Sequence, residues 1–342
     1  MKVKLYFENE KAISKSGIGK ALEHQKKALT LNQIDFTTDH KCTDYDVLHI
    51  NTTMFNSYFE VKKAKKLKKA IVYHAHSTVE DFKNSFAFSN LLSPFYKKWI
   101  KYLYSFGDVI VTPTEYSKSL LKSYGLKQPI YSVSNGIDVD RFIYNQDKVN
   151  AFRTYFNLDS QRKVIISVGW LFERKGFDTF CEVATYFPNV TFIWFGDKTL
   201  SMPTANIRHW IENKPDNVIL PGYISGDVIL GAYMSCDLFF FPSREETEGI
   251  VVLEALASKA PVLVRNIGVY NNWLIDGENC YKRENTKEFI DFIEKFLNNE
   301  FCDLSDKGYE TAQKRGFKSI GEQLCFAYRK ALEVCHDKSK KV

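Results

Sequence analysis

Two glutamates, Glu246 and Glu254, lie eight residues apart around a turn that leads from an apolar strand through a proline into a glycine-led helix. The first backbone N–H groups of a helix that begins near Gly249 have no intrahelical acceptor and carry a partial positive charge, which suits a diphosphate. Glu254, more than a turn inside the helix, can accept two hydrogen bonds from a ribose diol, and Glu246 can reach a sugar beyond the phosphates. The segment therefore predicts a nucleotide-sugar site. An ordinary strand-to-helix connection with solvated acids is the alternative.

Two further loops have the composition of phosphate-binding turns. Residues 163–169 are an apolar run that ends in glycine, and the cations Arg174 and Lys175 follow before an amphipathic stretch, which predicts a strand, a loop and a helix. Residues 2–7 predict a first strand, and residues 16–31 predict a glycine loop that opens a helix. Each loop taken alone is equally explained by a plain turn.

Together and in this order, these segments resemble the retaining glycosyltransferases of family 4. The match covers nearly the whole chain, and the motifs that carry it are Ser16-Gly17-Ile18-Gly19, His76, Asn135-Gly136-Ile137-Asp138, Arg174-Lys175-Gly176, Phe241-Pro242-Ser243 and the pair Glu246/Glu254. The resemblance implies an α/β fold of the GT-B type, in which two Rossmann-like domains face each other across a cleft. Each motif is short and common, but the joint set is specific.

The resemblance also implies roles for the charged residues. Lys175 would neutralise the donor diphosphate, Glu254 would bind the nucleotide ribose, and Glu246 would lie near the donor sugar. The family often has an arginine directly after the strand glycine, where this chain has Trp170. Arg174 is the residue that would restore this charge from another position.

The remaining donor-binding positions are mostly backbone contacts. The amides of Gly249, Ile250 and Val251 would face the distal phosphate. Gly17 and Gly19 would approach the donor from the opposite domain, and Tyr223, at the exit of a predicted strand, would flank the uracil.

Residues 70–77 predict an apolar strand whose C-terminal end presents His74 and His76, and α/β sheets bind ligands at such strand ends. Alternation along a strand places both histidines on the same side. A metal pair is one alternative, although no third ligand is evident nearby, and a histidine held by structural hydrogen bonds is another. By register with the family's strand-ending histidine, His76 is expected beside the donor sugar, with His74 as the second choice. No metal and no cofactor are expected, since the UDP-sugar is itself a substrate.

The length of 342 residues exceeds what one hydrophobic core usually serves. A polar stretch near residue 145 marks the domain boundary. We expect an N-terminal Rossmann-like, acceptor- and membrane-facing domain at 1–150 and a C-terminal nucleotide-sugar-binding domain at 151–320. A C-terminal helix that returns to the N-terminal domain, with a tail, is expected at 321–342.

The seven cysteines are scattered without C-x-x-C spacing, which indicates neither a disulfide framework nor a zinc site. The N-terminus does not resemble a signal peptide, and no stretch approaches the length of apolar sequence that spans a bilayer. A cytoplasmic protein, peripheral on the inner face of the cell membrane, is therefore expected.

The positive charge is concentrated in the N-terminal part of the chain. Residues 1–140 hold 21 Lys and no Arg against 14 acids, which gives 21 − 14 = +7, and the rest carries 26 − 27 = −1. A lysine run at 61–69 and an aromatic and basic stretch at 82–106 suit an anionic membrane surface. A solvated helix face and a packed core segment are the alternatives. Nucleic acid is not an expected partner, because this part lacks arginine.

Residues 15–21, 74–78 and 172–176 are similar to those of the short family members that add a second hexose to a membrane glycolipid, the diglucosyldiacylglycerol and galactosylglucosyldiacylglycerol synthases. The resemblance implies transfer from UDP-glucose or UDP-galactose to a glycolipid such as monoglucosyldiacylglycerol, by same-face attack that gives an α-linked product. Three alternatives stay open: an enzyme of the same fold with a soluble or polysaccharide acceptor, a sugar-nucleotide epimerase, and a non-catalytic sugar-nucleotide-binding or membrane scaffold protein.

Overall fold

The computed structural model describes residues 1–9, 17–196 and 203–340. The chain divides into two compact units, which we call unit 1 (Met1–Val79, Leu92–Asp138 and Arg315–Val342) and unit 2 (Glu80–Leu91 and Val139–Lys314). Each unit is built around a parallel sheet, which confirms the predicted α/β class. Residues 80–91 pack with unit 2 although the chain on either side of them belongs to unit 1.

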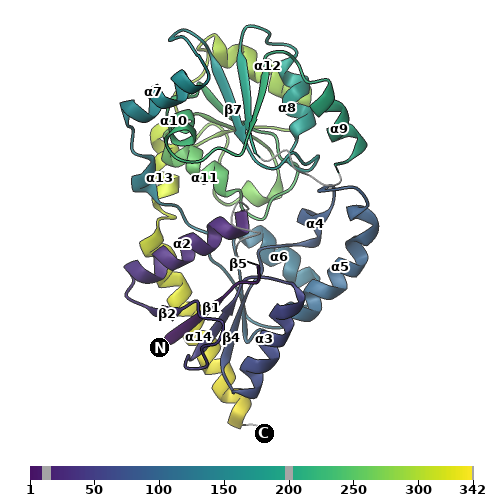
Figure 1. Cartoon of the computed structure of the whole chain (residues 1–342), viewed down its shortest axis with the longest axis vertical. Coiled ribbons are helices and arrows are strands. Elements are labelled where there is room, and N and C mark those ends of the chain that lie inside the picture. The colour runs from purple at the N-terminus through teal and green to yellow at the C-terminus, as the bar shows by residue number, and fades with distance from the viewer. Residues whose placement is uncertain (10–16, 197–202, 341–342) are drawn as a thin grey trace. The chain divides into compact units, whose positions relative to one another are not determined.

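The sheet of unit 1 has six described strands in the order β2-β1-β3-β4-β5-β6 (Figure 1). Its central strands are short and almost fully buried, as expected for a parallel sheet with helices on both faces. The strands are β1 (Lys2–Tyr6), β2 (Asp35–Thr37), β3 (Val47–Ile50), β4 (Ala70–His74), β5 (Val109–Thr112) and β6 (Ile130–Ser132).

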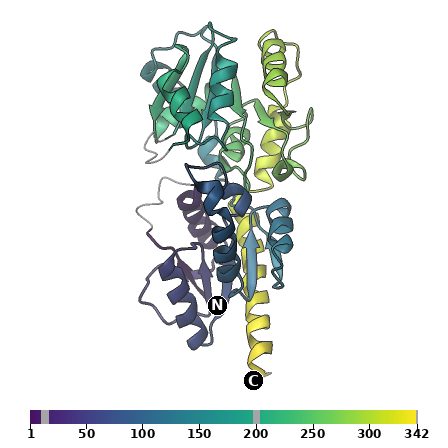
Figure 2. The same ribbon diagram turned by 90° about the vertical axis from the view of Figure 1, so that its right-hand side faces the viewer.

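Helices cover both faces of this sheet. Two apolar clusters fill the space between helices and strands, one under α2 (Gly17–Leu31) and α14 (Phe317–Lys340), the other under α3 (Phe55–Lys66), α5 (Ser89–Tyr104) and α6 (Glu115–Ser123). Figure 2 shows α14, in yellow, running along unit 1. It crosses α2 so closely that a Cβ on Gly321 would lie 2.6 Å from the Ala28 carbonyl oxygen. A short helix, α4 (Val79–Phe82), follows β4.

The sheet of unit 2 also has six described strands, in the order β12-β11-β10-β7-β8-β9. Numbered within the unit, this is the order 3-2-1-4-5-6 of a doubly wound dinucleotide-binding fold, whose order reverses between β7 and β10. The strands are β7 (Val164–Val168), β8 (Thr191–Phe195), β9 (Val218–Gly222), β10 (Leu238–Phe241), β11 (Val262–Arg265) and β12 (Tyr281–Arg283).

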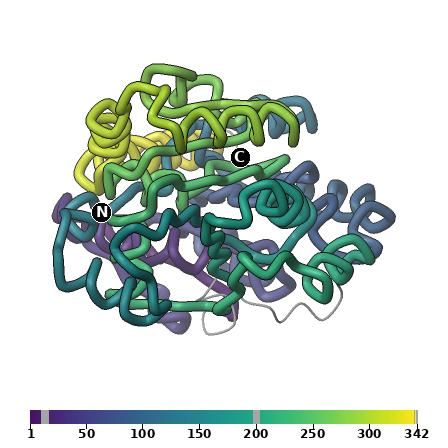
Figure 3. The backbone as a smooth tube through the Cα atoms, turned by 90° about the horizontal axis from the view of Figure 1, so that it is seen from above, coloured from purple at the N-terminus to yellow at the C-terminus, as the bar shows by residue number. Residues whose placement is uncertain are grey.

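Helices flank both faces of the second sheet as well (Figures 1 and 3). On one face, α8 (Phe177–Ala184), α9 (Ala205–Glu212) and α12 (Thr286–Leu297) enclose an aromatic-rich core. The remaining helices are α7 (Gln146–Tyr155), α10 (Asp227–Ser235), α11 (Ile250–Ala257) and α13 (Ser305–Gln313), with the 3-10 turns η1 (Val139–Phe142) and η2 (Gly268–Tyr270). Among the described residues, no helix combines the length and the apolar character needed to cross a bilayer.

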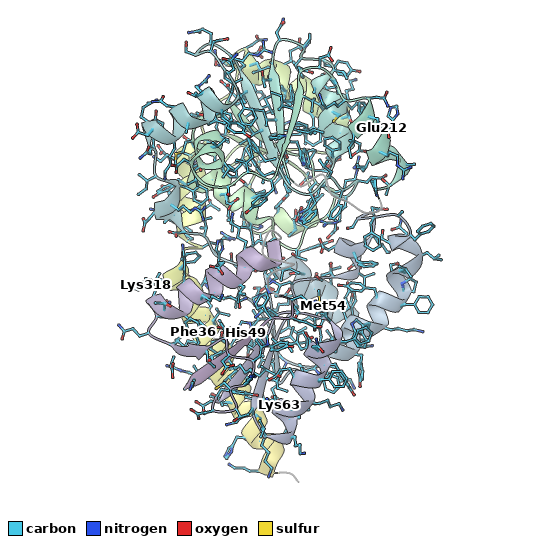
Figure 4. The ribbon with its side chains drawn as sticks, in the orientation of Figure 1. Phe36, His49, Met54, Lys63, Glu212 and Lys318 are labelled. Carbon is cyan, nitrogen blue, oxygen red and sulfur yellow. The ribbon has the colours of Figure 1, made fainter. Side chains whose placement is uncertain are left out.

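A buried polar network joins α2, β3, β4 and α14 inside unit 1, with His49 near its centre (Figure 4). His49 Nδ1 lies 2.7 Å from the Tyr328 hydroxyl, and His49 Nε2 lies 3.1 Å from His74 Nδ1. Gln25 Nε2 lies 3.0 Å from the same His74 nitrogen. The C-terminal helix and the sheet are thus joined by hydrogen bonds as well as by apolar contacts.

The network continues to the end of the strand. The His74 and His76 rings stack with their centroids 3.8 Å apart, which agrees with the expectation that both lie on one side. His76 Nε2 lies 2.8 Å from Asn51 Oδ1, an oxygen that also accepts a hydrogen bond from Gln25 Nε2 at 2.8 Å.

Burial keeps these imidazoles neutral because it disfavours the charged form. It lowers the pKa of His49 to about 3 and the pKa of His76 to about 3. The pKa of His74 is also well below its ordinary value, through burial and then through its two histidine neighbours. His24 Nδ1, on α2, donates to the carbonyls of Asn135 and Gly136 at 3.2 and 2.8 Å, and burial lowers the pKa of His24 to about 4.

We therefore expect the free energy of unfolding to decrease as the pH falls below about 6.5. The folded-state pKa values of His24, His49 and His76 lie below the ordinary value, so on acidification the unfolded chain binds protons that the folded chain does not. Each of these histidines should remove about 1.4 kcal/mol per pH unit between about pH 6.5 and its folded-state pKa, and nothing above about pH 6.5. Urea unfolding at a series of pH values measures this slope.

Two variants test the assignment. Replacing His24 or His49 by Gln should reduce the slope by one proton. An unfolding free energy that stays constant from about pH 7 to about pH 5.5 would contradict the assignment.

Candidate functional site

The two loops singled out by their sequence leave neighbouring strands of unit 2. Residues 169–176 follow β7 and residues 242–249 follow β10, and these strands pair in parallel where the strand order reverses. In open α/β sheets, ligands bind outside the carboxyl ends of the strands at this switch point. The strand order therefore brings the two predicted motifs to one place.

The first loop is tightly closed against the second. Gly176 adopts a left-handed conformation with φ of +79°, and a Cβ there would lie 2.4 Å from the Pro242 carbonyl oxygen. The Arg174 carbonyl accepts a hydrogen bond from the Arg244 amide at 2.7 Å. Only glycine fits such an approach, which explains the Arg-Lys-Gly sequence.

Lys175 and Glu246 form an ion pair between the two loops. Lys175 Nζ lies 2.5 Å from Glu246 Oε1, and the two side chains are 15% and 6% exposed. Ser243 Oγ donates a second hydrogen bond to the same oxygen at 2.8 Å. Burial acts to raise the pKa of Glu246, but the charges of Lys175 and Arg174 outweigh it and hold that pKa below its ordinary value. The carboxylate is therefore ionised and holds the lysine at the switch point.

Arg174 is occupied by protein acceptors. Its Nη1 atom lies 2.9 Å from Asp81 Oδ1 and donates to the Glu245 carbonyl at 2.8 Å, and its Nε atom donates to Ser85 Oγ at 3.1 Å. The guanidinium is only 8% exposed. Its predicted contact with phosphate stays a prediction, and this geometry assigns it a structural role between loops. Trp170 lies beside Phe172, with ring centroids 6.0 Å apart.

The second loop ends at the N-terminus of α11. Gly249 has φ of +91° and precedes the first helical residue, so Ile250 and Val251 lie in the first turn, where backbone amides point out of the helix. A Cβ on Gly249 would lie 3.2 Å from the Tyr270 hydroxyl. Tyr270 is fully buried, and its hydroxyl has no hydrogen-bond partner among the described residues. No local sequence motif marks Tyr270 as a site residue.

Glu254 lies on α11 and is 2% exposed. The Tyr233 hydroxyl, from α10, donates to Glu254 Oε2 at 2.8 Å. Tyr233 is itself buried between Phe142 and Phe239. Tyr233 was not predicted, because nothing in its local sequence marks it as a partner of Glu254. The tyrosine fixes the orientation of the carboxylate.

The remaining predicted residues lie elsewhere in the fold. Tyr223 directly follows β9 and is 49% exposed. Gly17 is the exposed first residue of α2 as described, Gly19 is buried in its first turn, and His76 belongs to the network of unit 1. Their contact with a donor stays a prediction. Lys15 and Ser16, which carried part of the resemblance, lie outside the described residues.

The carboxyl ends of β7 and β10 in unit 2 thus bring together the N-terminus of α11, the buried Lys175 and the carboxylates of Glu246 and Glu254. The first two can hold a diphosphate, and a carboxylate on α11 can hold a diol. Within the described part of the chain, no three His, Cys, Asp or Glu side chains are grouped as metal ligands would be. The arrangement suits a nucleotide diphosphate bound by protein groups.

Models of two protein families match the chain. The model described as "Glycosyl transferases group 1" matches residues 149–315, and the model described as "Glycosyltransferase Family 4" matches residues 30–141. The first range contains Lys175, Glu246 and Glu254, and the second contains His76.

Curated relatives are similar over much of the chain. The processive diacylglycerol alpha-glucosyltransferase of Acholeplasma laidlawii is 48% identical over 98% of this chain and 99% of its own length. The alpha-galactosylglucosyldiacylglycerol synthase of Streptococcus pneumoniae is 28% identical over 74% of this chain and 69% of its own length.

Solved structures show the same fold at lower identity. Anabaena Alr3699/HepE in complex with UDP-glucose superposes with a TM-score of 0.77 at 16% identity, over 95% of this chain and 98% of that one. Sucrose-phosphate synthase from Thermosynechococcus elongatus gives 0.79 at 16% identity, over 96% and 98%. These matches confirm the GT-B fold class, and the near full-length relative settles the family. The chain belongs to the family 4 glycosyltransferases.

Proposed function

We propose that this protein transfers glucose from UDP-glucose to diacylglycerol lipids in successive steps and forms α-linkages. The proposal extends the expected single transfer to monoglucosyldiacylglycerol to successive transfers that begin at diacylglycerol. Its main support is a near full-length relative, 48% identical, whose name describes a processive diacylglycerol alpha-glucosyltransferase. The relative from Streptococcus pneumoniae, an alpha-galactosylglucosyldiacylglycerol synthase, supports the same class of acceptor.

The donor end of the reaction follows from unit 2. As the bond between the sugar and the diphosphate breaks, negative charge grows on the departing UDP. Lys175 and the first amides of α11 can stabilise that charge, and Glu254 can hold the ribose. Lys175 is paired with Glu246, so a diphosphate that binds Lys175 competes with this carboxylate for the cation. The acceptor oxygen then bonds to the anomeric carbon on the face from which UDP departs, and its hydroxyl proton passes to the departing phosphate oxygen, so the configuration is retained.

We further propose that unit 1 binds an anionic membrane surface through α3 and α5. On α3, Phe55 and Phe59 are 75% and 64% exposed. Two exposed lysines, Lys62 and Lys66, continue the same helical stripe. Such a stripe places aromatic rings at headgroup depth and cations near lipid phosphates. Figure 4 labels Met54, which directly precedes α3, and Lys63, in the last turn of this helix.

Helix α5 repeats the pattern beside it. Phe95 is 70% exposed and Tyr102 46% exposed, with the exposed Lys98 between them on one stripe. Aromatic contacts join the two helices: Phe55 lies 5.3 Å from Trp99, and Tyr58 lies 6.0 Å from Tyr102, between ring centroids. The buried side of α5 packs in the core, so the stretch at 82–106 contributes both to the core and to the surface. We call these exposed residues of α3 and α5 the aromatic–lysine surface.

The decisive experiment supplies purified protein with labelled UDP-glucose or UDP-galactose and vesicles that contain diacylglycerol or monoglucosyldiacylglycerol. We expect glucose transfer to both lipids and an α-configured product. Sugar transfer only to a soluble or polysaccharide acceptor, conversion of the donor without an acceptor, or UDP binding without turnover would each refute the proposal in favour of one of the alternatives.

Replacing Lys175 by Ala should reduce kcat by about 100- to 1,000-fold, the size typical of one lost electrostatic contact to the transition state. Lys163→Ala is the matched control, because Lys163 precedes β7 and pairs with Asp237 at 2.9 Å at the opposite end of the strand. Steady-state transfer to monoglucosyldiacylglycerol measures both. Near-normal turnover by the Lys175 variant would show that the diphosphate is held elsewhere.

Replacing both Phe59 and Phe95 by Ser should weaken binding to anionic vesicles by about tenfold or more, since each exposed ring would otherwise bury apolar area in the lipid. Tyr155 and Tyr186, exposed aromatics of unit 2 at 59% and 61%, supply the control when both are replaced by Ser. Vesicle flotation measures the bound fraction. Equal loss in both double variants would place the membrane contact outside the aromatic–lysine surface.

A further inference from the structure

Residues 80–91 are a part of the N-terminal half of the chain that packs with unit 2. Three of their groups contact the same residue, Arg174. The Asn84 carbonyl accepts from the Arg174 amide at 3.0 Å, and Ser85 Oγ and Asp81 Oδ1 accept from its guanidinium at 3.1 and 2.9 Å. The segment therefore binds both the backbone and the side chain of the residue that precedes Lys175.

Four charged groups meet here in alternation. Arg174 lies between Asp81 and Glu246, and Glu246 lies between Arg174 and Lys175. Arg174 Nη1 is 2.9 Å from Asp81 but 3.9 Å from Glu246, whose oxygen is 2.5 Å from Lys175. Asp81 thus holds the arginine just short of close contact with Glu246.

The orientation of Arg174 in turn fixes the second loop. With its guanidinium drawn to Asp81, Nη1 also donates to the Glu245 carbonyl at 2.8 Å, directly before Glu246. Burial raises the pKa of Asp81, and among its charged neighbours Arg174 and Lys175 act to lower it while Glu246 acts to raise it. Asp81 therefore interacts electrostatically with Arg174, Lys175 and Glu246, the charged groups of the proposed donor site.

We propose that Asp81 is a positioning residue of the donor site. Its carboxylate holds Arg174 away from Glu246, so that Glu246 stays paired with Lys175 and the net charge beside the diphosphate is maintained. This inference rests on the proposed function. It gives residues 80–91, which lie outside the motifs that carry the family resemblance, a role in setting how tightly the diphosphate is held.

Asp81→Asn keeps the shape of the side chain and removes its charge. Arg174 should then close on Glu246 and release Lys175, which adds net positive charge beside the diphosphate. We expect UDP to bind about tenfold more tightly, the effect of one charge interaction near a protein surface, while kcat falls because Glu246 is captured. Loss of a merely structural contact would instead weaken UDP binding. Titration calorimetry with UDP and steady-state kinetics measure the two quantities.

Two comparisons make the test specific. Asp81→Glu should restore much of kcat, and Asp306→Asn, which removes the same charge from an exposed ion pair with Lys259 on unit 2, should change neither quantity. If Asp81 acts through Arg174, adding Asp81→Asn to Arg174→Gln should have no further effect on UDP affinity.

The outcomes separate this inference from the proposed function. Wild-type protein that does not bind UDP would refute the proposed function. Wild-type protein that binds UDP, with unchanged or weaker binding in Asp81→Asn, would overturn the positioning role alone. Should that variant unfold, the UDP affinity of Arg174→Gln decides: an affinity equal to that of the wild type overturns the role, because the proposed effect runs through this arginine.

Discussion

The arrangement of unit 2 depends on the buried ion pair between Lys175 and Glu246, at the carboxyl ends of its parallel strands. Removing two charges from water is costly, and a buried pair is tolerated only when further hydrogen bonds satisfy it. Ser243 supplies one of these bonds and Arg174 adds a neighbouring charge. The close approach at Gly176 holds the two loops in contact. Lys175 is thus held by an anion of the protein itself.

Unit 1 follows the opposite electrostatic principle. Its strand ends gather neutral imidazoles, amides and a phenol, and burial keeps them uncharged. His76, at the end of this network, is oriented by Asn51 and stacked on His74. Unit 2 thus gathers buried charges at its strand ends, whereas unit 1 gathers oriented neutral hydrogen-bonding groups.

Local sequence was enough to predict β1, β4, β7 and β10 and the loops that follow β7 and β10. The contact of the site candidates with a donor stays a prediction. Lys175 and Glu254 follow from short strand–loop–helix patterns, and strand order then brings their loops together. The position of Arg174 was predicted, but its partners were not, because Ser85 lies 89 residues away in the chain. The contacts of Tyr233, Asn51 and Asp81 were not predicted either. Their partners lie on distant elements, and no local sequence pattern indicates those contacts.

The C-terminal helix has a consequence for how the protein is made. Helix α14 completes the apolar core under β1, β4 and β5, and Tyr328 completes the polar network around His49. The ribosome finishes residues 139–314 before this helix emerges, so the later unit can fold while the earlier one still lacks a wall of its core. The later unit can therefore complete its core before the earlier one does.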